Sequence, residues 1–179
     1  KLLSYNFFYK MSISKLITEY LNQTNDKVVI TDNNRCYTAL EFKKKVYFFK
    51  NKLSKNIKIY EGLGILVERN VDYLAIIFAS MLNKNYYVPF STKSSPKLIK
   101  YQIKTSKIRL LICNSKNKRK NIIFRKIKNK TNNQIKKKKL AYIIYTSGST
   151  GPKKGVCISY KAYYSYIKSI KIYFKNKFK

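Results

Sequence analysis

The feature that most constrains the fold is a regular alternation of short apolar runs with helical segments between residues 62 and 113. The apolar runs "GLGILVE", "YYVPF" and "IRLLIC" each have the length of a buried strand. The two segments between them are predicted to be helices, and Asn70 can cap the first of them. Strand–helix–strand–helix–strand is the order of a parallel α/β sheet, so we predict the α/β fold class.

The residues before this alternation predict a helix, two short strands and a second helix. In residues 12–23, apolar side chains recur at helical spacing, at Ile13, Leu16, Ile17 and Tyr20. The two strands are predicted at "KVVITD" and "RCYT". Thr38 and Glu41 have the spacing of a capping box. The apolar side of the helix that they begin is predicted to carry Leu40, Val46, Phe49 and Leu53.

The residues after the alternation are first polar and then return to strand patterns. Residues 114–139 are rich in lysine and hold one apolar patch, "IIF", so we predict a variable surface segment there. Two further strands are predicted at "LAYIIYT" and "GVCIS", followed by a helix that begins near Tyr160. The stretch that joins these two strands is the most unusual in the chain.

This stretch, residues 145–156, concentrates glycine, small hydroxyl side chains and lysine. Three of the five glycines lie in it, at Gly148, Gly151 and Gly155. Glycine lets the backbone curl tightly, so that several N–H groups can point at one anion. Hydroxyl donors come from Thr146, Ser147, Ser149 and Thr150, and positive charge from Lys153 and Lys154. An ordinary hairpin needs only two to five turn residues, so the composition favours a phosphate-binding loop.

Two common nucleotide-binding motifs do not fit this loop. A Walker A motif would place a glycine at position 153, which is a lysine, and a Rossmann G-x-G-x-x-G does not match either. Residues 146–155 instead resemble the signature of the adenylate-forming enzyme superfamily, Ser/Thr-Ser/Gly-Gly-Ser/Thr-Thr-Gly-x-Pro-Lys-Gly, at every position but one. The exception is Lys153, where the family has proline, and Pro152 stands one place early.

Upstream segments extend the resemblance over about residues 12–170. "CYTALEF" is similar to the family's early "LTYxEL" segment, and the residues ending in "NYYVPF" are similar to the strand that ends "LKAGxAYVPID". Phe90 departs from the acidic residue that is common after that proline. "AYIIYTSGSTG" and "NYYVPF" resemble most the amino-acid-activating branch. That branch comprises the adenylation domains of nonribosomal peptide synthetases and the D-alanine–carrier protein ligases.

The resemblance implies a fold and an activity. The fold is the N-terminal portion of the family's large domain, with strand–helix units and a phosphate loop between two strands. The activity is the reaction of ATP with a carboxylate to an acyl-adenylate and pyrophosphate, and the branch named above implies an amino acid as that carboxylate. The acyl group then passes to the phosphopantetheine thiol of a carrier protein or to coenzyme A.

The resemblance also implies site residues. Lys154 is the expected catalytic residue, which stabilises the departing pyrophosphate. The expected ATP-binding residues are Thr146, Ser147, Gly148, Ser149, Thr150, Gly151, Lys153 and Gly155. Mg²⁺ is an expected cofactor, but its ligands belong to a later part of the family's domain, so no metal ligand is expected here.

The expected domain organisation follows from the same resemblance. Residues 1–11 are a candidate non-native leader, and residues 12–175 a partial adenylation domain that is truncated after the phosphate loop. The chain is therefore expected to be a fragment that is inactive alone. Two alternatives remain: a fragment of an acyl- or aryl-CoA ligase, and a non-enzymatic cationic binding protein or pseudogene remnant.

The formal net charge of +33 bears on the last alternative. All seven acidic residues lie at or before Asp72, so the remaining chain carries only positive charge. Such a balance favours nucleic-acid or membrane binding in general. However, lysine, asparagine, isoleucine and tyrosine are abundant together, which is typical of an AT-rich coding sequence. We therefore expect no specific nucleic-acid partner. No run approaches the roughly 18–20 apolar residues of a membrane span, so no membrane partner is expected either.

The cysteines exclude some chemistry. Cys36, Cys113 and Cys157 are far apart and the chain has no histidine, so neither a zinc-ligand spacing nor a Cys–His catalytic pair can be formed. Apolar residues flank the cysteines, which predicts buried, reduced thiols and a cytoplasmic location.

Overall fold

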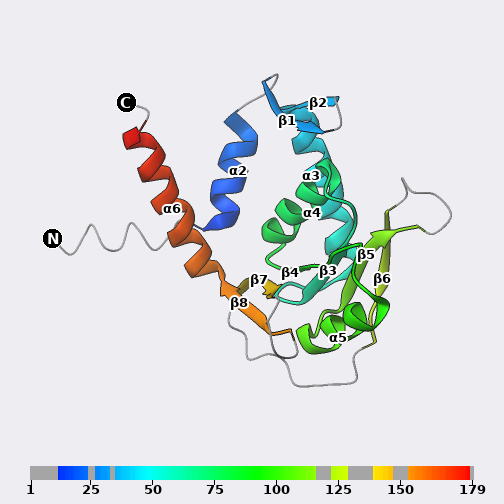
Figure 1. Cartoon of the computed structure of the whole chain (residues 1–179). Coiled ribbons are helices and arrows are strands. Elements are labelled where there is room, and N and C mark those ends of the chain that lie inside the picture. The colour runs from blue at the N-terminus through cyan, green and yellow to red at the C-terminus, as the bar shows by residue number, and fades with distance from the viewer. Residues whose placement is uncertain are drawn as a thin grey trace.

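The structure is a computed structural model that describes residues 12–23, 27–32, 35–115, 122–128, 139–146 and 153–177. Its centre is a six-stranded sheet with the strand order β6-β5-β3-β4-β7-β8 (Figure 1). In chain order the strands are β3 Gly62–Leu66, β4 Tyr86–Pro89, β5 Leu110–Asn114, β6 Ile122–Lys126, β7 Leu140–Tyr145 and β8 Gly155–Ser159.

The four inner strands of this sheet run parallel, and the two outer strands run antiparallel to their neighbours. β3 pairs in parallel with both β4 and β5, and β4 pairs in parallel with β7. β6 and β8 close the two edges as antiparallel partners of β5 and β7. The predicted α/β class is confirmed. β6 was not predicted, and it contains the "IIF" patch of the lysine-rich segment 114–139.

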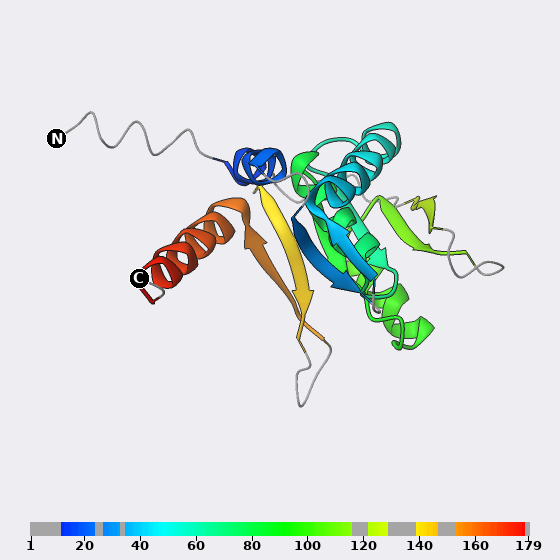
Figure 2. The ribbon, with the colours of Figure 1, turned by 90° about the horizontal axis from the view of Figure 1, so that it is seen from above.

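Helices cover both faces of the sheet (Figures 1 and 2). On one face lie α2 Ile13–Gln23, α3 Ala39–Asn56 and α4 Val71–Leu82, which contact one another. On the other face lies α5 Pro96–Ser106, and α6 Tyr160–Lys177 follows β8. A separate antiparallel hairpin, β1 Val28–Asp32 with β2 Arg35–Thr38, packs against α3.

The start of each central helix follows from local hydrogen bonding. The Thr38 hydroxyl accepts a bond from the Glu41 backbone N–H at 3.2 Å, and the Glu41 carboxylate accepts one from the Thr38 N–H at 2.9 Å. This is the predicted capping box. Asn70 caps α4 by accepting from the Tyr73 N–H at 3.0 Å, also as predicted. Ser95 caps α5 in the same way.

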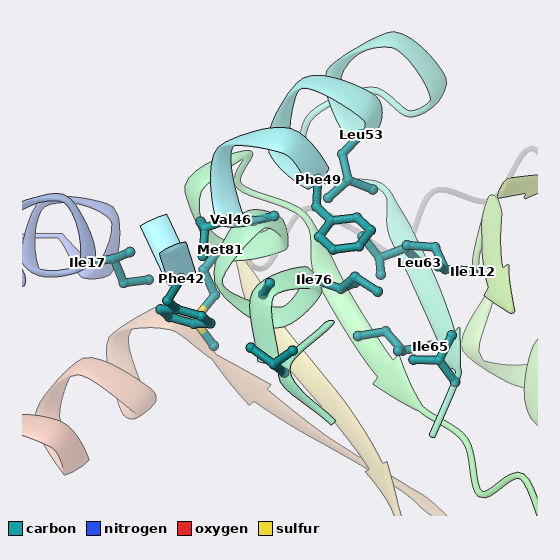
Figure 3. Close-up of a cluster of buried hydrophobic side chains, with 14 of the residues drawn as sticks. Ile17, Phe42, Val46, Phe49, Leu53, Leu63, Ile65, Ile76, Met81 and Ile112 are labelled. Atoms are coloured by element: carbon teal, nitrogen blue, oxygen red, sulfur yellow. The ribbon is translucent and has the colours of Figure 1, made fainter. Parts of the chain in front are cut away.

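The main core lies between α3, α4 and the sheet, and Figure 3 shows its side chains. Val46, Phe49 and Leu53 of α3 belong to one cluster with buried side chains of α4, β3 and β5, and Phe49 and Leu53 lie at the end of the cluster nearer the strands. Two predicted apolar positions are wrong, because Tyr20 is 45% and Leu40 is 38% exposed. Their neighbours Leu21 and Phe42 are buried instead, since they lie on the helix faces that meet α4 and the sheet. Of the other predicted positions, Ile13, Ile17, Val46, Phe49 and Leu53 are buried, so the predicted apolar faces are confirmed except at Tyr20 and Leu40.

The prediction that all three thiols are buried is wrong for two of them. Cys113 is buried in β5, whereas Cys36 and Cys157 are exposed. Cys36 lies in the small β1–β2 hairpin and Cys157 lies in the edge strand β8, so apolar sequence neighbours do not enclose either of them. In the described part of the chain, no three or more His, Cys, Asp or Glu side chains gather where they could hold a metal ion. Among the described helices, none is long and apolar enough to cross a membrane.

Tyrosines cluster where β4, β7 and α6 meet. The ring centroids of Tyr87 and Tyr142 are 5.5 Å apart, and those of Tyr142 and Tyr163 are 5.6 Å apart. The Tyr160 hydroxyl donates to the Asn85 carbonyl at 2.8 Å. Burial raises the pKa of Tyr87 and of Tyr160 far above its ordinary value of 10.0. On the opposite face of the sheet, burial also raises the pKa of Tyr86 to about 12.

These raised pKa values predict a loss of stability in alkali. The folded protein holds protons on these phenols at a pH where the unfolded chain releases them. The free energy of unfolding is therefore expected to fall as pH rises from about 10 toward 12. In a tyrosinate absorbance titration, part of the absorbance change should appear only together with unfolding, because Tyr86, Tyr87 and Tyr160 keep their protons in the folded chain. Tyr86→Phe should reduce this part of the change. A titration that is complete while the protein is still folded would contradict the prediction.

Candidate functional site

The predicted phosphate loop leaves the carboxyl end of β7 and returns as β8. Tyr145 and Gly155 are paired in the antiparallel register, and the Thr146 N–H donates to the Lys154 carbonyl at 3.1 Å. The Thr146 hydroxyl lies 3.5 Å from the same carbonyl. The structure thus brings together Thr146, Lys153, Lys154 and Gly155 at the base of the loop. The other predicted site residues lie outside the described residues: Ser147, Gly148, Ser149, Thr150 and Gly151.

The sheet topology places this base at an edge where α/β proteins bind ligands. β7 runs parallel to β4, and β4 runs parallel to β3. The carboxyl ends of these parallel strands therefore lie at the same end of the sheet as Thr146, which directly follows β7. In open α/β sheets, ligands bind outside the carboxyl ends of the strands. Figure 2 shows β7 and β8 as a long hairpin that extends beyond the rest of the sheet at this end.

The side chains at the base suit an anionic ligand. Lys154 is exposed and Lys153 is half-buried. Among the described residues, neither lysine forms an ion pair, so both ammonium groups remain available to a ligand. Gly155 has no side chain. A Cβ atom at this position would lie 3.0 Å from Ile143 and 3.3 Å from the Tyr145 ring, which is a tight fit. The donor set therefore fits the phosphates of ATP. The four described residues of the base include no carboxylate for Mg²⁺.

Helix α5 contacts the loop base on both its incoming and its outgoing side. The Tyr145 hydroxyl, on the incoming strand, lies 2.6 Å from the Thr105 hydroxyl and donates to the Gln102 carbonyl at 3.2 Å. On the outgoing side, the Tyr101 hydroxyl donates to the Lys153 carbonyl at 3.3 Å. Burial raises the pKa of Tyr145, and its hydrogen bonds to Thr105 and Ser106 oppose that rise. The phenol therefore stays protonated and able to donate at neutral pH.

Sequence reasoning missed these α5 residues. Tyr101 and Thr105 are one helical turn apart, so they share a face of α5, but that spacing alone does not indicate which strand the face meets. Gln102, between them, is buried, and its side-chain oxygen has no hydrogen-bond partner in the described part of the structure. The signal in the sequence was a polar residue, Gln102, at a helical position whose spacing from Leu98 and Ile99 predicts an apolar one.

A second feature lies at the opposite edge of the sheet from β8. A groove of about 820 Å³ runs between α3 and β6, with Phe48, Phe49 and Phe124 among its lining residues. Lys44, Lys45 and Lys52 also line it, and Lys45 forms an ion pair with Asp72 at 2.6 Å. The described residues that line the groove include none of the predicted site residues. It is a cationic surface feature, separate from the loop.

Comparison with known proteins identifies a family for the chain. The family model described as AMP-binding enzyme matches residues 17–179. Gramicidin S synthase 1 of Brevibacillus brevis is 28% identical over 186 residues, which covers 92% of this chain and 16% of the relative. Tyrocidine synthase 1 of Brevibacillus parabrevis is 23% identical over 184 residues, which covers 93% of this chain and 16% of the relative.

Solved structures show the same fold. The N-terminal subdomain of Klebsiella oxytoca NpsA, in complex with 3-hydroxyanthranilyl-AMSN, matches with a TM-score of 0.66 and 19% identity. The match covers 84% of this chain and 41% of that one. The O-succinylbenzoate coenzyme A synthetase MenE of Bacillus subtilis, in complex with AMP, matches with a TM-score of 0.66 and 16% identity over 89% of this chain and 45% of that one.

The chain therefore spans less than half of these solved structures and a small part of the two synthases. The match of the family model covers nearly the whole chain, including the α/β sheet and the β7–β8 hairpin. The chain belongs to the AMP-binding enzyme family of adenylate-forming enzymes, and it resembles the adenylation domains of nonribosomal peptide synthetases.

Proposed function

We propose that the protein activates a carboxylate with ATP, forming an acyl-adenylate and pyrophosphate, and that amino acids are the substrate class. The observation that carries this proposal is the loop base at the carboxyl end of β7. It brings Thr146, Lys153 and Lys154 together, and neither ammonium group forms an ion pair within the described part of the chain. A polyphosphate can occupy such a base, because two cations are available to meet its charge.

The chemistry requires one anion to attack another. The carboxylate oxygen attacks the α-phosphorus of ATP, and the bond to the bridging oxygen of pyrophosphate breaks. Negative charge grows on the leaving pyrophosphate, so a fixed cation beside it lowers the barrier. Lys154 is the proposed catalytic cation, while Thr146 and the backbone N–H groups of the loop hold the phosphates. Mg²⁺, when bound, would neutralise further phosphate charge, with ligands from outside the described residues.

The substrate class rests on the sequence and its relatives. "AYIIYTSGSTG" and "NYYVPF" resemble the amino-acid-activating branch, and the matched proteins include gramicidin S synthase 1. We propose transfer of the acyl group to the thiol of a carrier protein, a proposal supported by the likeness of the chain to the artificially fused adenylation–PCP di-domain NpsA-ThdA of Klebsiella oxytoca. The second candidate is an acyl- or aryl-CoA ligase, favoured by the match to the coenzyme A synthetase MenE.

Carboxylate-dependent exchange of labelled pyrophosphate into ATP tests this function in the complete gene product. Pools of amino acids, aryl acids and fatty acids should be compared at equal concentration. We expect exchange with an amino-acid pool and none without added carboxylate. Exchange only with aryl or fatty acids would favour the second candidate. Release of ADP and phosphate in place of exchange would contradict the adenylation chemistry.

The positive charge of the chain leads us to a prediction about how it would bind nucleic acids. Because no base-reading motif accompanies the charge, any DNA binding is expected to be independent of sequence and to arise from counterion release. Its affinity should therefore fall by orders of magnitude between low and physiological salt. Fluorescence anisotropy with several unrelated duplexes measures this directly. A preferred duplex that stays bound in physiological salt would contradict the account and support a nucleic-acid function.

A further inference from the structure

We propose that helix α5 holds the base of the phosphate loop, with Tyr101, Thr105 and Tyr145 as positioning residues for the ATP-binding residues Thr146 and Lys154. The inference rests on the proposed function of the loop. Its structural basis is that α5 is hydrogen-bonded to Tyr145, the last residue of β7, and to Lys153, which lies just before β8, although these residues lie 40 to 52 positions later in the chain.

The contacts on the incoming strand centre on one phenol. The Tyr145 hydroxyl lies 2.6 Å from the Thr105 hydroxyl and donates to the Gln102 carbonyl at 3.2 Å. Tyr145 is the last residue of β7, and Thr146, which bonds to Lys154 across the base, follows it directly. The ring of Tyr145 therefore ties the point where the loop begins to α5.

The contact on the outgoing side of the loop base is to the backbone just before β8. The Tyr101 hydroxyl donates to the carbonyl of Lys153 at 3.3 Å. That carbonyl belongs to the peptide group that joins Lys153 to Lys154, so this bond restricts the orientation of the backbone from which the Lys154 side chain extends. The residue proposed to stabilise pyrophosphate is thus held through its neighbour by α5.

The need for such support follows from the topology. β8 is the edge strand of the sheet, and among the described strands it pairs with β7 alone. The residues Gly155, Val156 and Cys157 of β8 are exposed, so little side-chain packing restrains the outgoing strand. A hairpin without further contacts would bend and twist relative to the sheet. Anchoring its base to α5 lowers the entropy that ATP binding must otherwise remove.

The effect of these two hydroxyl groups on the loop base can be measured separately from the general stability of the fold. Tyr101 is 38% exposed and its ring is not part of either buried cluster, so Tyr101→Phe removes a hydroxyl without opening a cavity. Thr105→Val removes the other hydroxyl while it keeps the shape of the side chain, and Thr105→Ser retains the hydroxyl. Tyr166→Phe is the matched control, because Tyr166 is 60% exposed and lies on α6, away from the loop base.

Hydrogen exchange of the Thr146 amide in the ligand-free chain is the first measurement. This amide closes the loop base, so its exchange reports how often the base opens. We expect Tyr101→Phe and Thr105→Val to increase its exchange rate several-fold, while amides of β3 and α4 keep their rates. Thr105→Ser and Tyr166→Phe should leave it unchanged. An unchanged Thr146 rate in both hydroxyl-deleted variants would overturn the inference, and so would an increase of equal size throughout the chain.

The second measurement is the Michaelis constant for ATP in the complete gene product. Loss of one hydrogen bond should raise this constant roughly 2- to 12-fold in Tyr101→Phe and in Thr105→Val. The Michaelis constant for the carboxylate should stay the same. A general disturbance of the fold would change the constants for both substrates. Faster Thr146 exchange with an unaltered constant for ATP would overturn the positioning role. If the unmodified protein does not use ATP, the proposed function fails, and hydrogen exchange still decides whether α5 holds the loop base.

Discussion

Replacing Lys154 by alanine is expected to lower the rate of adenylate formation by about 10²–10³, as is typical when one preorganised electrostatic contact is removed. The effect should fall on the step in which charge moves onto pyrophosphate, and not on transfer of the acyl group to a thiol. Folding stability should change by no more than about 0.5 kcal/mol, because Lys154 is exposed and forms no ion pair with any described residue. Single-turnover adenylate formation in the complete gene product measures the first effect, and thermal unfolding the second.

Lys153 is the internal control for this variant. It stands where the family has proline, and its ammonium group can partly replace that of Lys154. We expect Lys153→Ala to have a smaller effect than Lys154→Ala, and the double variant to be slower than either. If Lys153→Ala is the more damaging single change, the match of the motif is displaced by one residue and the catalytic role belongs to Lys153. If Lys154→Ala and the unmodified protein form the adenylate at equal rates, Lys154 has no catalytic role.

Replacing Gly64 by alanine is expected to destabilise the fold by about 1–3 kcal/mol, through overpacking in the centre of the sheet. A Cβ atom at Gly64 would overlap the Phe90 ring and lie 2.7 Å from Ile108 Cδ1. Phe90 and Ile108 are buried in the cluster on the α5 side of the sheet, so the ring has little room to move. For a chain of this size, the melting temperature should fall by roughly 2–12 °C.

Gly155→Ala provides the comparison for this stability effect. Its new Cβ would lie 3.0 Å from Ile143 and 3.3 Å from Tyr145, and Gly155 is exposed on an edge strand. A shift of a few tenths of an ångström can relieve those contacts, so a smaller loss of melting temperature is expected. If Gly155→Ala proves more destabilising than Gly64→Ala, the packing of Phe90 against β3 is not as the structure describes it.

The sequence predicted most of the elements because their signals are local. The capping box of Thr38 and Glu41 and the Asn70 cap involve atoms within three residues of one another, so spacing alone predicts where α3 and α4 begin. Strands β3 and β5 are buried on both faces and therefore consist almost wholly of apolar residues, which is a pattern that a short window of sequence reveals.

The features that the sequence did not predict depend on distant parts of the chain. β6 is formed because "IIF" pairs with β5 and covers its edge, and its flanking lysines conceal that pattern. Leu40 looks as apolar as Phe42, but only the position of α4 decides which of them is buried. For the same reason, the contacts of Tyr101 and Thr105 with the loop base emerge only once α5 is placed beside β7 and β8.

The central claim, that the β7–β8 loop binds polyphosphate, is tested most directly by mapping backbone amide shifts while the chain is titrated with pyrophosphate and with ATP. We predict that the largest shifts cluster between Thr146 and Gly155 and saturate. Lys154→Ala should weaken this binding. Lys44→Ala, which removes a lysine from the groove between α3 and β6, should leave it unchanged. Shifts spread over all lysine-bearing surfaces, with both variants weakening the binding equally, would contradict the claim.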